Sequence, residues 1–307
     1  MFRLSTARIA SVRGFSTSAS VAKKVDTLSV IGAGQMGLGI ALVASNKAGL
    51  QVNLIDANQA ALDKGLKFMD KLLEKDVGKG RLTSDEAQAV RGRVSGHTNL
   101  QSAVADVDMI IEAVPEIPKL KFGIFRDLNE WTKKDTILAT NTSSISITKI
   151  AAAAGAGADR VISAHFMNPV PVQKGVEIIT GLQTSPETLA TTLEVVKRMG
   201  KIPSISKDSP GFLANRILMP YINEAIITLE TGVGEKEDID NILKNGCAMP
   251  MGPLALADFI GLDTCLAIMR VLYEDTGDSK YRPSVLLTKY VDAGWLGKKS
   301  GKGFYDY

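Results

Sequence analysis

The segment Gly32-Ala-Gly34-Gln-Met-Gly37 constrains the fold more than any other part of the chain. It follows Thr27–Ile31, a short apolar and β-branched run typical of a buried parallel strand, and it precedes a predicted helix at Leu38–Lys47. The first glycine permits a tight turn, the second lets the backbone approach a pyrophosphate, and the third allows the helix to pack on the strand. The pattern therefore predicts a phosphate-binding turn at a helix N-terminus.

Asp56 extends this unit into a predicted dinucleotide site. It ends a second predicted strand, Gln51–Ile55, which follows directly on the predicted helix. A carboxylate here can accept hydrogen bonds from both ribose hydroxyls of NAD and would repel the extra phosphate of NADP. No arginine follows directly, since the chain continues Ala57-Asn-Gln59. We therefore expect NAD; the alternative is an ordinary glycine turn.

Strand-like and helical segments alternate over the next part of the chain. A helical stretch at about 58–92 is interrupted at Gly78 and Gly80, which predicts a helical hairpin inserted between strands. The strand-like segments that follow are Met109–Ile111, Thr136–Leu138, Val161–Ser163 and Val176–Ile179. This alternation predicts an α/β fold with a doubly wound, mostly parallel sheet of Rossmann type.

From Asp208–Pro210 onward the pattern is almost wholly helical, and we predict a domain boundary there. The expected organisation is an NAD-binding Rossmann domain over residues 25–207 and an all-α C-terminal domain over residues 208–307.

The segment 1–24 has a composition of its own. It is rich in Ser, Thr and Ala and carries five basic residues and no acidic one. This composition predicts a mitochondrial presequence and a location in the matrix, with a disordered tail as the alternative. Removing those five from the 36 basic residues leaves 31 against 33 acidic ones, so the sequence predicts no nucleic-acid surface. No apolar run reaches the roughly 18 residues that a membrane-spanning helix needs.

Few residues in this chain could carry metal or acid–base chemistry. The two cysteines, Cys247 and Cys265, have neither metal-site nor disulfide-framework spacing, so we predict no metal site. The histidines are His97 and His165. His165 follows a predicted strand, at the edge where an open sheet presents ligands, and histidine suits a base at neutral pH. We expect His97 in a loop or at the entry of a strand.

Five further segments resemble the 3-hydroxyacyl-CoA dehydrogenase family and occur in the family's order. They are Glu112-Ala-Val-Pro-Glu116, Asn141-Thr-Ser-Ser144, His165-Phe-Met-Asn-Pro169, Pro210-Gly-Phe-Leu-Ala-Asn-Arg216 and Gly303-Phe-Tyr305. With the glycine turn they span everything after the segment 1–24. The resemblance implies an enzyme of fatty acid β-oxidation that passes hydride between NAD and C3 of an L-3-hydroxyacyl-CoA thioester. Short-chain, 3-hydroxybutyryl-CoA members are among the most similar patterns.

The resemblance also implies roles for individual residues. His165 would take the hydroxyl proton, and Glu177, in the next strand-like segment, would hold its second ring nitrogen and fix the tautomer. Ser143 and Asn215 would hold the 3-oxygen of the substrate. Ser143 could also, or instead, be the N-cap of a helix.

Further residues match family positions near the two nucleotides. Those near the nicotinamide and its ribose are Glu116, Lys121 and Asn141. Those near the CoA phosphates are Lys64, Lys67 and Lys71, for which a solvated helix face is an equal explanation. Two features depart from the pattern: Ala151–Ala158, taken as a slightly longer loop than in relatives, and Met167, which bears on acyl chain length.

The resemblance further implies a homodimer that pairs through the helical domain. Its apolar stripe could equally be internal core, and comprises Ile217, Leu218, Tyr221, Ile222, Ala225 and Leu229. Two other functions stay open. One is a same-fold dehydrogenase of a non-CoA hydroxy acid such as a sugar acid, and the other is a catalytically retired relative. β-Hydroxyacid dehydrogenases use a lysine base, and their glycine-rich substrate segment is absent from this sequence.

Overall fold

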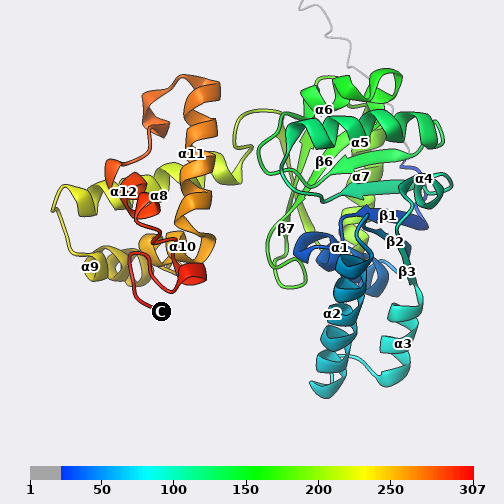
Figure 1. The fold of residues 1–307 in the computed structure, drawn as a ribbon, viewed down its shortest axis with the longest axis horizontal. Helices are drawn as coiled ribbons and strands as arrows, with labels where there is room; N and C mark the ends of the chain where they lie inside the picture. Colours follow the sequence, from blue (N-terminus) through cyan, green and yellow to red (C-terminus); the bar gives the residue numbers. More distant parts are fainter. Residues whose placement is uncertain (1–21) are drawn as a thin grey trace, which may run out of the picture.

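The computed structural model describes residues 22–307. One sheet with helices on both faces forms the larger part, and the helices after residue 213 form a group of their own beside it (Figure 1). Most of the predicted leader lies outside the described residues. Lys23, however, belongs to the folded body: its amide donates to Thr191 Oγ1 at 2.9 Å, and its ammonium lies 2.6 Å from Asp135.

Eight strands make up the sheet, in the order β3-β2-β1-β4-β5-β6-β7-β8. They are β1 (Thr27–Ile31), β2 (Gln51–Ile55), β3 (Val94–His97), β4 (Met109–Glu112), β5 (Ile137–Thr140), β6 (Val161–Phe166), β7 (Gly175–Thr180) and β8 (Ile202–Lys207). All neighbours run parallel except β6 and β7. The predicted doubly wound fold is confirmed. Its strand order reverses between β1 and β4, which is where such sheets bind ligands.

Helices cover both faces of this sheet and build the group beside it. Those of the larger part are α1 (Gln35–Lys47), α2 (Gln59–Gly78), α3 (Ser84–Gly92), α4 (Leu100–Val104), α5 (Pro118–Trp131), α6 (Ile147–Ala153) and α7 (Pro186–Arg198). Those of the helical group are α8 (Ala214–Glu230), α9 (Lys236–Asn241), α10 (Pro253–Ile260), α11 (Leu262–Thr276) and α12 (Val285–Asp292). None of the helices from residue 22 onward is long and apolar enough to cross a membrane.

A helical hairpin stands out from the sheet at the residues where the sequence predicts one. In Figure 1, α2 and α3 project away from the strands as a pair. Asn58 caps α2 by accepting from the amides of Ala60 and Ala61. Thr83 and Glu86 form a capping box that begins α3. The turn between the helices therefore has defined ends, and this fixes where the hairpin's lysines lie.

Three details differ from the expectations. The sequence pattern does not predict strand β8, because its edge position leaves Ile202 62% and Ile205 54% exposed, so the segment lacks a buried face. The short strand β3 is not predicted, and His97, which we expected in a loop or at the entry of a strand, is instead the last residue of this strand. The region Ala151–Ala158 is not a loop, since α6 and a 3₁₀ turn at Gly155–Arg160 occupy it. Alanine favours helix, and the buried side chains of α6 anchor it to the sheet.

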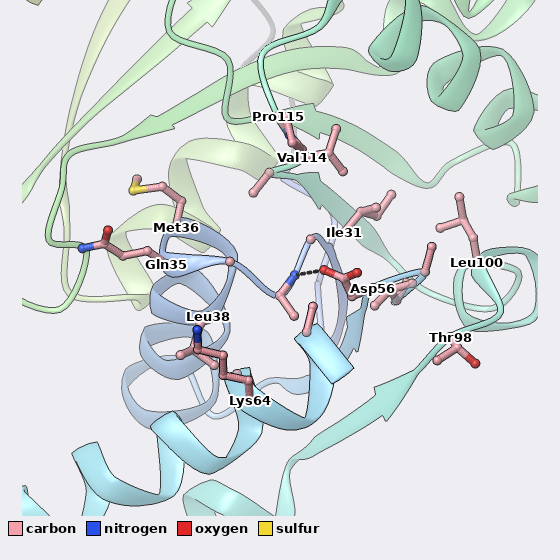
Figure 2. A pocket seen from close by; sticks show the side chains of 18 of the residues that line it. Ile31, Gln35, Met36, Leu38, Asp56, Lys64, Thr98, Leu100, Val114 and Pro115 are labelled. Atoms are coloured by element: carbon pink, nitrogen blue, oxygen red, sulfur yellow. Dashed lines mark hydrogen bonds between the residues drawn. The ribbon is translucent and has the colours of Figure 1, made fainter. Parts of the chain in front are cut away.

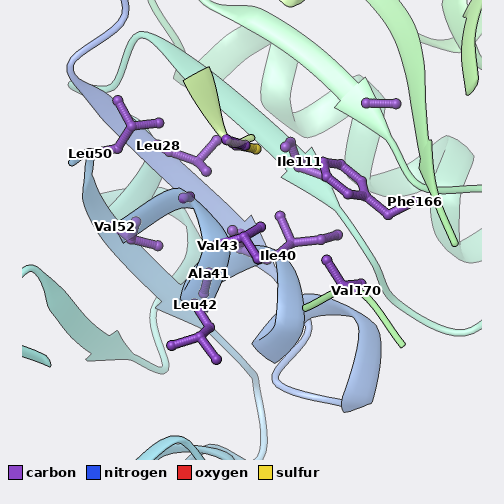
Figure 3. Close-up of a cluster of buried hydrophobic side chains, with 14 of the residues drawn as sticks. Leu28, Ile40, Ala41, Leu42, Val43, Leu50, Val52, Ile111, Phe166 and Val170 are labelled. Carbon is purple, nitrogen blue, oxygen red and sulfur yellow. The ribbon is translucent and has the colours of Figure 1, made fainter. Parts of the chain in front are cut away.

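The main core lies between α1 and the strands. Figure 3 shows Ile40 and Val43 of α1 directed at Leu28 and Ile111 of the sheet. Each such side chain contributes about 1.5–3 kcal/mol when it leaves water. This packing holds α1 rigidly against β1, so the turn that joins them has a fixed shape.

The helical group has a core of its own. On α8, Ile222 and Ala225 of the predicted stripe are buried in it, while Ile217 is 71% exposed. The C-terminal segment closes over α10, because the buried Asp258 carboxylate accepts from the amides of Phe304 and Tyr305, both at 2.9 Å. The stripe is thus partly internal core, in line with one of the two expectations for it.

Candidate active site

The three glycines of the turn after β1 differ in what surrounds them. Gly32 has φ +104°, and a Cβ there would lie 2.7 Å from the carbonyl oxygen of Ala113. A Cβ on Gly37 would lie 1.9 Å from the carbonyl oxygen of Gly32. A Cβ on Gly34 would meet nothing within 4 Å. Gly32 and Gly37 therefore permit close packing, while Gly34 faces open space where a diphosphate can approach the backbone. The residues fit a dinucleotide.

Asp56 joins this turn to the pocket beside it. Its Oδ2 accepts from the amide of Ala33 at 3.0 Å (Figure 2), and its Oδ1 accepts from the amide of Asn58 at 2.9 Å. The pocket has a volume of about 980 Å³ and a mostly apolar lining that includes Ile31 and Val114. It opens at the carboxyl ends of β1, β2 and β4. An acidic group at one end of an apolar slot suits a ribose beside an adenine ring.

His165 and Glu177 face each other across the only antiparallel pair of the described sheet. The register of β6 and β7 places these two residues directly opposite. Nδ1 of His165 lies 2.8 Å from Oε2 of Glu177, and the residues are 9% and 5% exposed. Two residues from successive strands thus form a cross-strand contact. Nδ1 is engaged, which leaves Nε2 for a substrate.

The second oxygen of Glu177 is held by the start of the helical group. Its Oε1 accepts from the amides of Leu213 and Ala214, each at 2.8 Å. Burial raises the pKa of Glu177, but the hydrogen bonds from His165, Ala214 and Leu213 lower it more, so its pKa lies below the ordinary 4.5. The carboxylate is therefore ionised at neutral pH. Phe212, with φ +50°, lies edge-on to the His165 ring at 6.2 Å between centroids.

Glu116 accepts several hydrogen bonds from the loop that follows β5. Its Oε1 accepts from the side chains of Thr142 and Ser144 and from the amides of Ser143 and Ser144, at 2.9 and 3.1 Å for the two amides. Asn215 reaches the same loop, because its Nδ2 lies 3.5 Å from the carbonyl oxygen of Ser143. The structure thus brings Ser143, Asn215 and Glu116 together. The helix cap expected at Ser143 is wrong: Ser146 caps α6 by accepting from the amide of Lys149.

Two of the other predicted nicotinamide neighbours take structural contacts. Asn141 Oδ1 accepts from the amide of Phe166 at 2.8 Å, which ties the end of β5 to the residue after His165. Lys121 is 1% exposed, and its ammonium lies 2.6 Å from Glu112 and 3.3 Å from Glu116. Lys121 is therefore the buried ion-pair partner of both glutamates, and it does not line the large pocket.

The three hairpin lysines share one surface. Lys64, Lys67 and Lys71 line a hollow of about 560 Å³ on α2, together with Phe68. Lys64 also borders the large pocket (Figure 2). A cationic hollow beside the dinucleotide pocket can accept a second phosphate-bearing ligand.

Sequence reasoning missed several residues of the site. The half-exposed aromatic Phe68 lies between the hairpin lysines, and Met36 and Leu120 line the large pocket. An aromatic residue on a charged helix face was a usable signal for Phe68. Glu112 was noted only within a motif, although it is fully buried and paired with Lys121. A glutamate that ends an apolar strand is the signal for that pair.

Two family models cover nearly the whole described chain. The 3-hydroxyacyl-CoA dehydrogenase NAD-binding domain matches residues 27–209, and the C-terminal domain of the same family matches residues 211–307. The chain belongs to the 3-hydroxyacyl-CoA dehydrogenase family. Its membership confirms the expected fold, NAD as cofactor, and the oxidoreductase class.

Individual members of this dehydrogenase family are similar over their full length. A probable 3-hydroxybutyryl-CoA dehydrogenase of Bacillus subtilis is 51% identical over 284 residues, which are 92% of this chain and 98% of that protein. The human mitochondrial hydroxyacyl-coenzyme A dehydrogenase is 40% identical and covers 97% of this chain and 96% of its own. The crystal structure of (S)-3-hydroxybutyryl-CoA dehydrogenase PaaH1 from Ralstonia eutropha has a TM-score of 0.89 at 45% identity, over 92% of this chain and 99% of that one.

Proposed function

We propose that this protein oxidises L-3-hydroxyacyl-CoA to 3-ketoacyl-CoA with NAD, and catalyses the reverse reduction. The observation that carries this is the buried pair of His165 and Glu177, 2.8 Å apart, near the carboxyl edge of a sheet with an NAD-binding turn. Removing hydride from a secondary alcohol requires a base for the hydroxyl proton, and this pair supplies one. Short acyl chains are the proposed substrates, by analogy with the 3-hydroxybutyryl-CoA enzymes among its relatives.

His165 would accept the hydroxyl proton at Nε2. Glu177 holds Nδ1, so the proton stays on that nitrogen and the acceptor lone pair points away from Glu177. When His165 becomes positively charged, the Glu177 carboxylate stabilises it. NAD supplies the hydride acceptor when it is bound. In the reverse direction, protonated His165 would return its proton to the 3-keto oxygen.

Ser143 and Asn215 would hold the 3-oxygen of the substrate. Both are neutral donors, and they come from different parts of the molecule: Ser143 follows β5, and Asn215 lies in the first turn of α8. Their contact at 3.5 Å supports a shared task. Neutral donors can polarise the carbonyl without fixing a charge beside it. Glu116, which accepts hydrogen bonds from the Ser143 loop, would fix the conformation of that loop near the nicotinamide. Lys121, as the ion-pair partner of Glu116, and Asn141, through its contact with Phe166, would support this arrangement.

The hairpin would bind the CoA nucleotide. Lys64, Lys67 and Lys71 would meet its phosphates in the hollow on α2, with Phe68 beside them. Lysine binds phosphate as a point charge, so several lysines around one hollow raise local affinity.

The decisive experiment is NADH oxidation by purified protein that begins at residue 22. Acetoacetyl-CoA is the substrate, and free acetoacetate is the matched control that lacks CoA. Turnover of the thioester alone supports the proposal, and a series of longer 3-ketoacyl thioesters then measures chain-length preference. A folded protein that binds NADH and turns over neither compound would contradict it.

The start of the chain and the oligomeric state are proposed on separate grounds. The basic, acid-free segment 1–24 supports import into the mitochondrial matrix, where β-oxidation would be its setting, and the similar human protein carries a mitochondrial name. Fusing this segment to a fluorescent protein tests the proposal: a diffuse signal would contradict import.

We also propose a homodimer that pairs through the helical group.

A further inference from the structure

Lys201 is a buried lysine whose ammonium has no carboxylate partner among residues 22–307. It lies between α7 and β8 and is 8% exposed. Its Nζ donates to the carbonyl oxygens of Val170 and Gln173, the latter at 2.7 Å. Burial lowers the pKa of this ammonium. Burying a cation with only carbonyl groups as partners costs free energy. The segment that carries these carbonyl groups therefore indicates what the contact stabilises.

The two carbonyl groups belong to the loop that joins β6 to β7. Within it, the amides of Val172 and Gln173 both donate to the carbonyl oxygen of Pro169, at 3.0 and 2.9 Å, which makes a tight turn. Lys201 adds hydrogen bonds to two further carbonyl oxygens of this turn, those of Val170 and Gln173. The adjacent strand pairing continues it, since the amide of Ile202 donates to the carbonyl oxygen of Lys174 at 2.9 Å. One ammonium thus fixes the connection between the strands of the catalytic pair.

The same loop contacts the NAD-binding turn and its helix at two points. Val170 is buried beside Ile40 of α1 (Figure 3), and a Cβ on Gly39 would lie only 2.8 Å from the Cβ of Val170. Asn168 Oδ1 accepts from Nε2 of Gln35 at 3.1 Å. Gln35 belongs to the glycine turn and lines the large pocket. The loop is therefore packed between the catalytic strands and the cofactor cradle.

We propose that Lys201 is a positioning residue that holds the β6–β7 loop against the glycine turn, and so sets the fit of NAD relative to His165. The base itself does not depend on Lys201, because strand pairing already fixes the distance from His165 to Glu177. What Lys201 controls is the position of Asn168 and Val170 against α1. The inference rests on the proposed function for the role of His165, but its effect on NAD binding can be measured without any turnover.

The test compares Lys201→Met, which keeps a stem of similar length and removes the charge, with Lys201→Arg, which keeps the charge. The control is Lys197→Met, an exposed lysine near the end of helix α7, four residues before Lys201. NADH binding is titrated by its fluorescence on protein free of thioester. We expect Lys201→Met to weaken NADH binding about tenfold, the size of roughly one hydrogen bond. Lys201→Arg should regain most of it, and Lys197→Met should match the wild type.

Kinetics separate positioning from loss of structure. The KM for NADH should rise in Lys201→Met, because NADH would bind more weakly in the ground state and the transition state alike. The KM for acetoacetyl-CoA should stay within about twofold of the wild-type value, because the thioester site is unchanged. Unchanged NADH affinity in folded Lys201→Met overturns the proposal, as does a KM for NADH that keeps its wild-type value while turnover falls with the folded fraction. If Lys201→Met does not fold, Asn168→Ala takes its place. Normal NADH affinity in folded Asn168→Ala, which removes the contact to Gln35, would then overturn it.

The two proposals can fail separately. A wild-type protein that ignores the thioester leaves the NADH titration intact, so the role of Lys201 is decided even when the proposed substrate is wrong.

Discussion

The chemistry of His165 depends on what its Nδ1 touches. Alone on a strand, a histidine is an ordinary polar side chain; a buried carboxylate 2.8 Å from Nδ1 gives His165 the fixed orientation that its proposed role as base requires. Neither His165 nor Glu177 lines the large pocket, so this pair contributes little to the cofactor site. Catalysis and NAD binding should therefore separate on mutation.

Replacing His165 with glutamine should lower turnover about 10²–10⁴-fold, the usual contribution of a general base. NADH binding should stay nearly unchanged, because the glycine turn and Asp56 are untouched. Steady-state rates with acetoacetyl-CoA and an NADH fluorescence titration measure both. Weak NADH binding by a well-folded His165→Gln protein would remove the residue from its proposed role.

Replacing Asp56 with alanine should reduce the preference for NADH over NADPH by roughly tenfold, as two hydrogen bonds to a ribose and one repulsion disappear. The ratio of kcat/KM for the two cofactors is the measurement. Asp63 is a suitable control, because it is an acidic residue on α2 near the lysine hollow. An unchanged ratio in Asp56→Ala would show that the Asp56 side chain serves only the turn at Ala33.

At the residue scale, the sequence indicated His165 and the glycine turn because each belongs to a motif with fixed spacing, whereas Glu177 was implied only by the resemblance to the family. It could not give the environment of Lys121 or Lys201. Both are charged residues in segments that look exposed, and both are buried by contacts with residues outside their own elements. Burial of a charge depends on tertiary partners, which a local pattern does not contain.

At the scale of elements, the central strands were predictable because they are short apolar runs that alternate with helical segments, and the hairpin because Gly78 and Gly80 interrupt a helical pattern. The edge strand β8 was not, since it has exposed isoleucines and a proline. The antiparallel turn into β7 was equally hidden. It matters most, because the antiparallel register places Glu177 directly opposite His165.

The loop after β5 should show acid-dependent stability through Glu116. Burial raises the pKa of Glu116, but Lys121 and the hydrogen bonds from Thr142, Ser143 and Ser144 lower it more, and the pKa lies below the ordinary 4.5. A carboxyl whose pKa is lowered on folding stabilises the folded state above about pH 4.5, and this share is lost as pH falls through the lowered value.

Glu116→Gln should therefore be less stable than the wild type at neutral pH, and the difference should shrink as pH falls below about 4.5. Urea unfolding at stepped pH values gives this difference directly. A gap that stays constant from neutral pH to about pH 3.5 would show that ionised Glu116 contributes nothing to the fold.

At the scale of the whole molecule, the helical group has more apolar surface than its own core uses. Exposed apolar side chains lie at both ends of α8, with Ile217 at 71% and Val233 at 78% exposure. Contiguous exposed apolar patches are typical of contacts between chains, so these side chains are candidates for the contact of the proposed homodimer. We expect sedimentation to report a dimer, and Ile217→Asp to shift it toward monomer; a wild-type monomer would contradict pairing of two subunits.

Glu177 holds two things at once: the ring of His165 with one oxygen and the first amides of the helical group with the other. A shift of α8 that withdrew those amides would raise the proton affinity of the carboxylate and so change the strength of the base. Thermodynamic reciprocity then requires the converse, that protonating the pair changes how firmly the two halves of the molecule hold together. Any change in the angle between the two halves that lengthened these hydrogen bonds would therefore be linked to the proton affinity of the pair.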